Sequence, residues 1–99
     1  MTPKNKIRDK ISKKDLENYY KITHKAFSIV LKNVVNGREE DAKEIILMVE
    51  SYLSDAKYFE GKGDYVNSFG AIYYAHGWID CGVRLGIFDV KDDKLFTIR

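Results

Sequence analysis

The sequence predicts an all-α fold, an up-down-up bundle of three helices with a short extended C-terminal tail. In residues 16–34 and again in 42–59, apolar residues recur at alternating spacings of three and four, the pattern of a helix with one buried face. Residues 64–86 are apolar around most of the helical girth, and a helix of this kind is surrounded by protein. The connections between the stretches are short, so consecutive helices are expected to lie antiparallel. The third helix is therefore expected at the centre, wrapped by the other two.

Length and composition predict one soluble cytoplasmic domain. Ninety-nine residues suffice for a single core, and 44% hydrophobic with 32% charged residues is typical of a folded soluble protein. The one cysteine, Cys81, excludes an intrachain disulfide and fits a reducing compartment. His76 and Asp80 interrupt the longest apolar stretch, so no membrane span is expected. The lysines near the N-terminus precede no apolar run, so no signal peptide is expected.

The first helix is predicted to begin at Ser12. Ser12 with Asp15 three residues later forms a capping box in which Asp replaces the usual Glu. The apolar stripe then runs from Leu16 to Val34. Gly37 is expected to end the helix, because glycine adopts the left-handed conformation that a helix terminus favours.

The second helix is predicted to begin at residues 39–41, three acidic residues that suit the positive end of a helix dipole. Gly61 and Gly63 are expected to end it, and Asp64 is expected to cap the third helix.

The chain divides into three segments. Residues 1–11 are predicted to be a basic mobile arm, and residues 12–86 to be the three-helix bundle. Residues 87–99 are predicted to be an extended tail that packs on the bundle or on a partner chain. The alternative for this tail is a small hairpin of two short strands around a turn at 91–94.

Three runs in the third helix carry a resemblance to a known family. The runs GDYV at 63–66, YAHGWID at 74–80 and GVRLG at 82–86 resemble the short archaeal proteins grouped as domain-of-unknown-function family 357. The resemblance extends from about Leu16 into the tail and leaves the basic arm outside. It implies a stand-alone three-helix bundle and an archaeal source. The family has no assigned activity to carry over.

His76, Asp80 and Arg84 are the candidate polar cluster, because they follow one another at spacings of four on one side of the third helix. Asp80 could orient His76 as a general base, and the spacing also suits metal ligands, with His24 at a similar height on the first helix. We favour a structural interpretation, in which Asp80 accepts a hydrogen bond from His76 and pairs with Arg84. The sequence has no zinc-binding spacing, phosphate-binding loop or nucleophile elbow, so no catalytic residue, metal or cofactor is predicted.

Two further features of the third helix have structural interpretations. Cys81 has no adjacent base and is predicted to be a small buried apolar residue. Gly82 and Gly86 have the spacing of a membrane dimerisation motif, but we expect them to serve close packing within the bundle.

The arm and the start of the first helix form a basic region. The candidate phosphate contacts are Lys4, Lys6, Arg8, Lys10, Lys13 and Lys14, continued by Lys21 and Lys25. Tyr19 and Tyr20 beside them could stack on single-stranded bases. The alternative is a solvated tail that keeps the protein soluble.

The third helix also predicts an interface. Two neighbouring helices leave one of its arcs uncovered, and this arc holds Tyr74, Trp78 and Leu85. The cover is expected from the tail, through Leu95 and Phe96, or from a second copy of the chain. We expect a symmetric homodimer in which the tail and this arc share the interface.

These observations favour a non-enzymatic module that acts by association, with itself or with another protein. The alternative is an accessory nucleic-acid-binding protein that uses the basic arm. The sequence leaves the biological process and the identity of any partner open.

Overall fold

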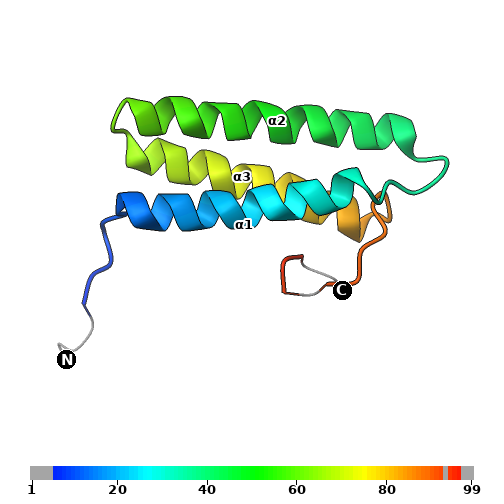
Figure 1. Cartoon of the computed structure of the whole chain (residues 1–99), viewed down its shortest axis with the longest axis horizontal. Helices are drawn as coiled ribbons and strands as arrows, with labels where there is room; N and C mark the ends of the chain where they lie inside the picture. Colours follow the sequence, from blue (N-terminus) through cyan, green and yellow to red (C-terminus); the bar gives the residue numbers. More distant parts are fainter. Residues whose placement is uncertain (1–5, 93, 97–99) are drawn as a thin grey trace.

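The computed structural model describes residues 6–92 and 94–96. It has three α-helices, α1 (Lys13–Leu31), α2 (Glu39–Gly61) and α3 (Tyr65–Arg84), which run up, down and up (Figure 1). The described residues contain no strand, only one isolated antiparallel bridge between Val34 and Phe88. The predicted all-α three-helix fold is confirmed.

Both other helices pack against α3. α1 and α2 each pack along α3, whereas they approach one another at only a few points. The predicted central position of α3 is therefore confirmed. One face of α3 is nonetheless exposed along its whole length, and it holds Cys81, which was expected to be buried.

Small buried residues on α3 make this shared packing possible. The residues are Ser68, Ala71, Ala75 and Gly82, which lie on the side that faces the other helices. The Ser68 hydroxyl donates a hydrogen bond to the carbonyl oxygen of Ala56 in α2 at 2.8 Å. Short side chains let helix axes come close, and the one buried hydroxyl is paired.

Two of the three helix starts are capped as predicted. The Ser12 hydroxyl accepts from the backbone N–H of Asp15 at 3.0 Å, and the Asp15 carboxylate accepts from the N–H of Ser12 at 3.2 Å. The Asp64 carboxylate accepts from the N–H of Asn67 at 3.1 Å. Helix α2 has no side-chain cap, and three acidic residues fill its first turn.

Helix α1 ends at Leu31, several residues before the glycine that was expected to end it. The chain then runs beside the tail. The N–H of Val35 donates to the carbonyl of Ile87 at 2.9 Å, and the N–H of Asp89 donates to the carbonyl of Asn33 at 2.8 Å. This pairing with a distant segment takes residues 33–35 out of the helix, which a helical apolar stripe cannot reveal.

The described part of the tail packs on its own bundle. Ile87, Phe88 and Phe96 are all buried in the main core cluster. Gly86, at φ +75°, turns the chain out of α3 and back toward the core. The hairpin alternative is not seen in the described residues, where 94–96 form a turn and bend, and residues 97–99 lie outside them.

Gly82 and Phe88 fit together closely. A Cβ atom at Gly82 would lie 2.7 Å from Cδ2 of Phe88 and 3.0 Å from Cδ1 of Ile45. The predicted close packing of Gly82 within the bundle is therefore confirmed, whereas Gly86 serves as a turn.

We expect Gly82→Ala to lower the free energy of unfolding by about 1–3 kcal/mol, because the methyl group would push the buried Phe88 ring out of place. Urea unfolding would measure the change. Gly61→Ala is the matched control, because a Cβ there meets no atom within 4 Å and alanine favours helix. Equal stability of Gly82→Ala and the parent would contradict this account of the tail.

Candidate functional site on the central helix

Helix α3 has an exposed and almost uncharged strip, which we call the outer face. Eight residues of α3 are exposed, and only one of them, Arg84, carries a charge. The outer face consists of these eight residues and Leu85 just beyond the helix: Val66, Asn67, Gly70, Tyr73, Tyr74, Gly77, Cys81, Arg84 and Leu85. Exposed positions of α1 and α2 are mostly charged, so this nearly uncharged strip sets α3 apart from the other two helices.

The predicted interface residues divide between the outer face and the core. Tyr74 is 52% exposed and Leu85 58%, as an interface requires. Phe96 is instead buried in the core, and Leu95 lies across His76 on another side of α3. The expectation that the tail shares one surface with the aromatic arc is therefore wrong for the described residues.

Trp78 is largely covered by its own chain. It packs against the main core cluster, and its ring meets Tyr74 edge to face at 6.4 Å. Its indole Nε1 is buried and has no hydrogen-bond partner within the described part of the chain. Trp78 is therefore a poor probe of association, because truncating it would also damage the core.

Two glycines in the middle of α3 have no role within the described chain. A Cβ atom at Gly70 or at Gly77 would meet no atom within 4 Å. Glycine inside a helix costs roughly 1 kcal/mol relative to alanine. Both lie on the outer face, seven residues apart, so the least stable residues of α3 occupy its most accessible strip.

Cys81 is exposed, which corrects the prediction that it is buried. It lies on the arc of Trp78 and Tyr74, on the exposed side of α3. The error came from treating this arc as covered.

His76 joins α1, α3 and the tail. Its Nδ1 lies 2.9 Å from the hydroxyl oxygen of Thr23, and its Nε2 lies 2.8 Å from the carbonyl oxygen of Leu95. A carbonyl oxygen can only accept, so Nε2 carries the proton and, in the neutral ring, Nδ1 accepts from Thr23. The Asp80 carboxylate is 3.9 Å from Nε2, too far for the predicted hydrogen bond. The partners of His76 are thus Thr23 and the tail.

The other members of the metal hypothesis do not converge. His24 is exposed and stacks on Tyr20 at 5.9 Å, while its neighbour Thr23 faces His76. Within residues 6–92 and 94–96, no group of three or more His, Cys, Asp or Glu side chains could hold a metal ion. Arg84 lies exposed in the last turn of α3, where a positive charge suits the helix dipole.

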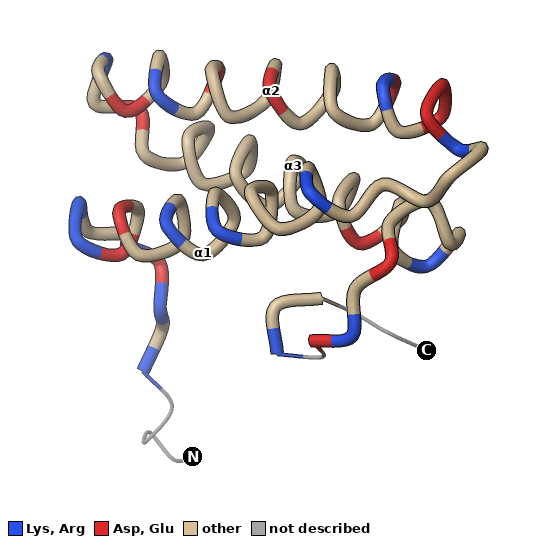
Figure 2. The backbone as a smooth tube through the Cα atoms, turned by 45° about the vertical axis from the view of Figure 1, so that its right-hand side comes forward, with Lys and Arg blue, Asp and Glu red and all other residues tan. Residues whose placement is uncertain are grey.

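Charge is separated across the molecule (Figure 2). Residues 6–37, which include α1, hold eight basic and three acidic side chains, whereas residues 38–63, which include α2, hold four basic and seven acidic ones. The candidate phosphate contacts within the described chain, Lys6, Arg8, Lys10, Lys13 and Lys14, are all exposed, and Lys4 lies outside it. Lys14, Lys21, Lys25 and Lys32 form an exposed row on the solvent side of α1.

Between α1 and α3 lies an aromatic groove, which we define by Tyr19, Phe69 and Tyr73. The ring of Tyr19 lies 5.1 Å from that of Phe69 and 5.5 Å from that of Tyr73. Tyr19 lines two hollows, one on the side of the arm and one on the side of the tail. One, of about 350 Å³, reaches the arm at Arg8, and the other, of about 210 Å³, reaches the tail at Lys94.

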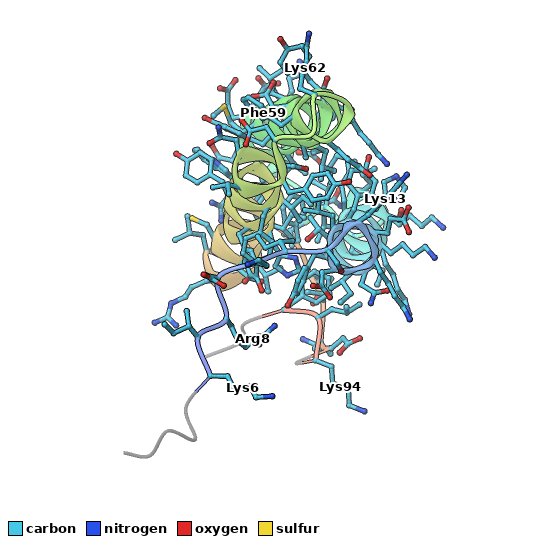
Figure 3. The ribbon with its side chains drawn as sticks, turned by 90° about the vertical axis from the view of Figure 1, so that its left-hand side faces the viewer. Lys6, Arg8, Lys13, Phe59, Lys62 and Lys94 are labelled. Atoms are coloured by element: carbon cyan, nitrogen blue, oxygen red, sulfur yellow. The ribbon has the colours of Figure 1, made fainter. Side chains whose placement is uncertain are left out.

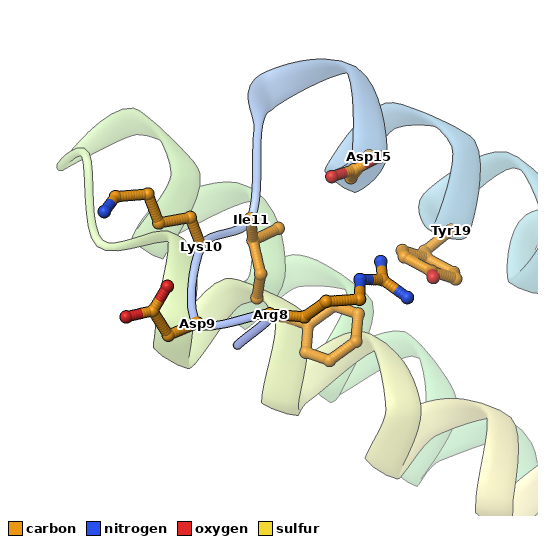
Figure 4. A pocket seen from close by; sticks show the side chains of 7 residues that line it. Arg8, Asp9, Lys10, Ile11, Asp15 and Tyr19 are labelled. Carbon is orange, nitrogen blue, oxygen red and sulfur yellow. The ribbon is translucent and has the colours of Figure 1, made fainter. Parts of the chain in front are cut away.

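Basic side chains lie at both ends of the aromatic groove. Viewed along the bundle, Lys6, Arg8 and Lys94 lie on the same side of the molecule, opposite Lys62 (Figure 3). The Arg8 side chain extends toward the ring of Tyr19 (Figure 4). Partial burial, together with the neighbouring Tyr19 hydroxyl, raises the pKa of Tyr73, so its phenol stays neutral and acts as a flat aromatic surface. Only Tyr19 of this groove was foreseen, because Phe69 and Tyr73 reach it from a different helix.

We expect Thr23→Val to lower the free energy of unfolding by about 1–3 kcal/mol, because His76 Nδ1 would lose its donor at a partly buried site. Trypsin should also cut faster after the exposed Lys94, since the tail is held through His76. Ser51→Ala is the control, because its hydroxyl bonds a helix carbonyl on the exposed surface. If both variants unfold alike, His76 does not fasten the tail.

Comparison with known proteins yields one match. No helix in the described part of the chain is long and apolar enough to cross a membrane. No curated protein and no solved structure matches the chain. The model of one family matches residues 18–88, which span most of α1, all of α2 and α3, and the first residues of the tail. The chain therefore belongs to the DUF357 family, described as proteins of unknown function.

Proposed function

We propose that the protein is a non-enzymatic association module whose outer face binds the same face of a second copy. The observation that carries this proposal is the pair of open glycines. Gly70 and Gly77 weaken α3 and fill no space in their own chain, so their use must lie in what approaches from outside. A glycine on a helix surface lets another backbone or a large side chain come close.

The outer face contains both parts of a self-complementary contact. Tyr74 is 52% exposed and lines a shallow hollow with Gly77 and Cys81, whereas the Tyr73 ring packs against Tyr19 and Phe69 in the groove. In a two-fold dimer the same patch meets itself, so each copy would supply a large side chain and a shallow site to receive it. Aromatic residues are favoured at the centre of such interfaces.

Charge favours a second copy over another partner at this face. The outer face carries one charged residue, Arg84, at its C-terminal end, so two copies meet with little like-charge repulsion. The α1 side is strongly basic and the α2 side acidic, and neither would bind itself.

We expect the parent protein to form a dimer at high micromolar concentration and Gly77→Gln to remain a monomer. Sedimentation velocity would measure the mass, and alkylation of Cys81, the one thiol, should slow in the dimer. The monomer of Gly77→Gln should unfold at the same temperature or higher, because glutamine favours helix and its Cβ would meet no atom within 4 Å.

Gly61→Gln is the matched control for this test. It makes the same change at an exposed helical glycine on α2, so the dimer should persist. A parent protein that stays monomeric at high micromolar concentration, with Cys81 equally reactive throughout, would overturn the proposal.

A second candidate function is accessory binding of nucleic acid through the basic side. The specific observation in its favour is that the exposed Arg8 of the arm lines the hollow beside the aromatic groove (Figure 4). Lysine and arginine contacts to phosphate release counterions, which makes affinity depend on salt.

We expect Lys6→Ala/Lys10→Ala to bind single-stranded oligonucleotide less tightly and with a weaker salt dependence. The log–log slope should fall by about 1.4, since each lost contact to a single strand removes roughly 0.7. Lys43→Ala/Lys62→Ala is the control with the same change in net charge on α2. Identical slopes for the two variants would remove the arm from the binding surface.

A further inference from the structure

We propose that the aromatic groove binds unpaired bases of a single-stranded nucleic acid, while the arm and Lys94 hold its phosphates. This inference rests on the second candidate function and names the ligand class and the place where its bases lie.

The groove offers a stacking surface. Tyr19, Phe69 and Tyr73 form a continuous cluster, with Phe69 and Tyr73 in contact edge to face at 4.6 Å. Tyr73 is 52% exposed, and Tyr19 lines both hollows. Bases of any sequence stack on aromatic side chains, because every base has a flat π-face.

The charges around the groove complement a polyanion. Arg8 extends toward Tyr19 at one end, and Lys94 lines the other end. The carboxylates in the same hollow interfere little, because Asp15 is engaged at the start of α1 and Asp9 points away from Tyr19 (Figure 4). Lys25 lies about one helical turn from Ile22, which lines the second hollow, whereas Lys21 lies beside Lys57 on the α2 side.

The placement of these cations favours a strand over a free nucleotide. Arg8 lines the hollow at the start of α1, and Lys94 lines the other hollow, beside Thr23 and His76. The two cations thus serve different hollows along the groove. Several phosphates joined in a strand would meet them.

The polar groups in the groove favour binding without sequence preference. The Thr23 hydroxyl and both His76 ring nitrogens are already paired with each other or with Leu95. A base edge would therefore find few hydrogen-bond partners, whereas its face would find aromatic rings. A duplex, whose bases are stacked on one another, could not use these rings.

Anisotropy of a labelled single-stranded oligonucleotide of mixed sequence at low salt would test the inference. Tyr73→Leu should lower its affinity by roughly five- to 150-fold, the range seen when a stacking ring is removed. The salt dependence should not change, and Tyr73→Phe should bind like the parent. Tyr58→Leu is the matched control, an exposed tyrosine on α2.

All variants should be compared in the Gly77→Gln background, because Tyr73 also borders the outer face and its loss must not act through dimer formation. The groove proposal is wrong if Tyr73→Leu binds the oligonucleotide as tightly as the parent. Binding through the arm would still stand in that case, provided that the salt dependence of the affinity falls in the Lys6→Ala/Lys10→Ala variant. Duplex DNA bound as tightly as the single strand would also overturn stacking. An absence of binding by the parent at low salt would overturn both proposals.

Discussion

The fold depends on one constraint: a single helix of 20 residues must serve as the packing wall for two other helices and a tail. Helix α3 meets this demand by giving one side to small residues, with Ala75 and Gly82 where neighbours come closest. The Phe88 ring fills the space that Gly82 leaves, so the tail completes the core that α1 and α2 cannot close. Burial of rings of this size is worth several kcal/mol, a large share of the stability of a small domain.

Sharing one helix leaves strips that no neighbour covers. α1 and α2 flank α3 without enclosing it, so the outer face stays open on one side and the aromatic groove stays partly open on another. The tail closes the groove beyond His76, where the His76 ring holds the tail through a hydrogen bond to the Leu95 carbonyl. The candidate sites are thus the parts of α3 that packing does not use, which is why they hold the glycines, the exposed tyrosines and the thiol.

Local signals in the sequence predicted the three helices and where two of them begin. They did not predict where α1 ends or which residues contact His76. The caps at Ser12 and Asp64 and the central position of α3 followed from short-range rules. The early end of α1 and the partners of His76 depend on the tail, which returns to the bundle from far along the chain. The exposure of Cys81 depends on which sides of α3 the other two helices cover, so periodicity along α3 could not predict it.

Tyr73 connects the two proposed functions, because it borders both the outer face and the aromatic groove. A dimer formed through the outer face would place two basic grooves on one particle. A strand held by one groove would then meet the second at a high effective concentration, so two weak sites would act as one stronger site. Such avidity requires no deep pocket and few contacts that distinguish one base from another. It would allow a domain of 99 residues, with shallow hollows and one basic side, to hold an extended polyanion.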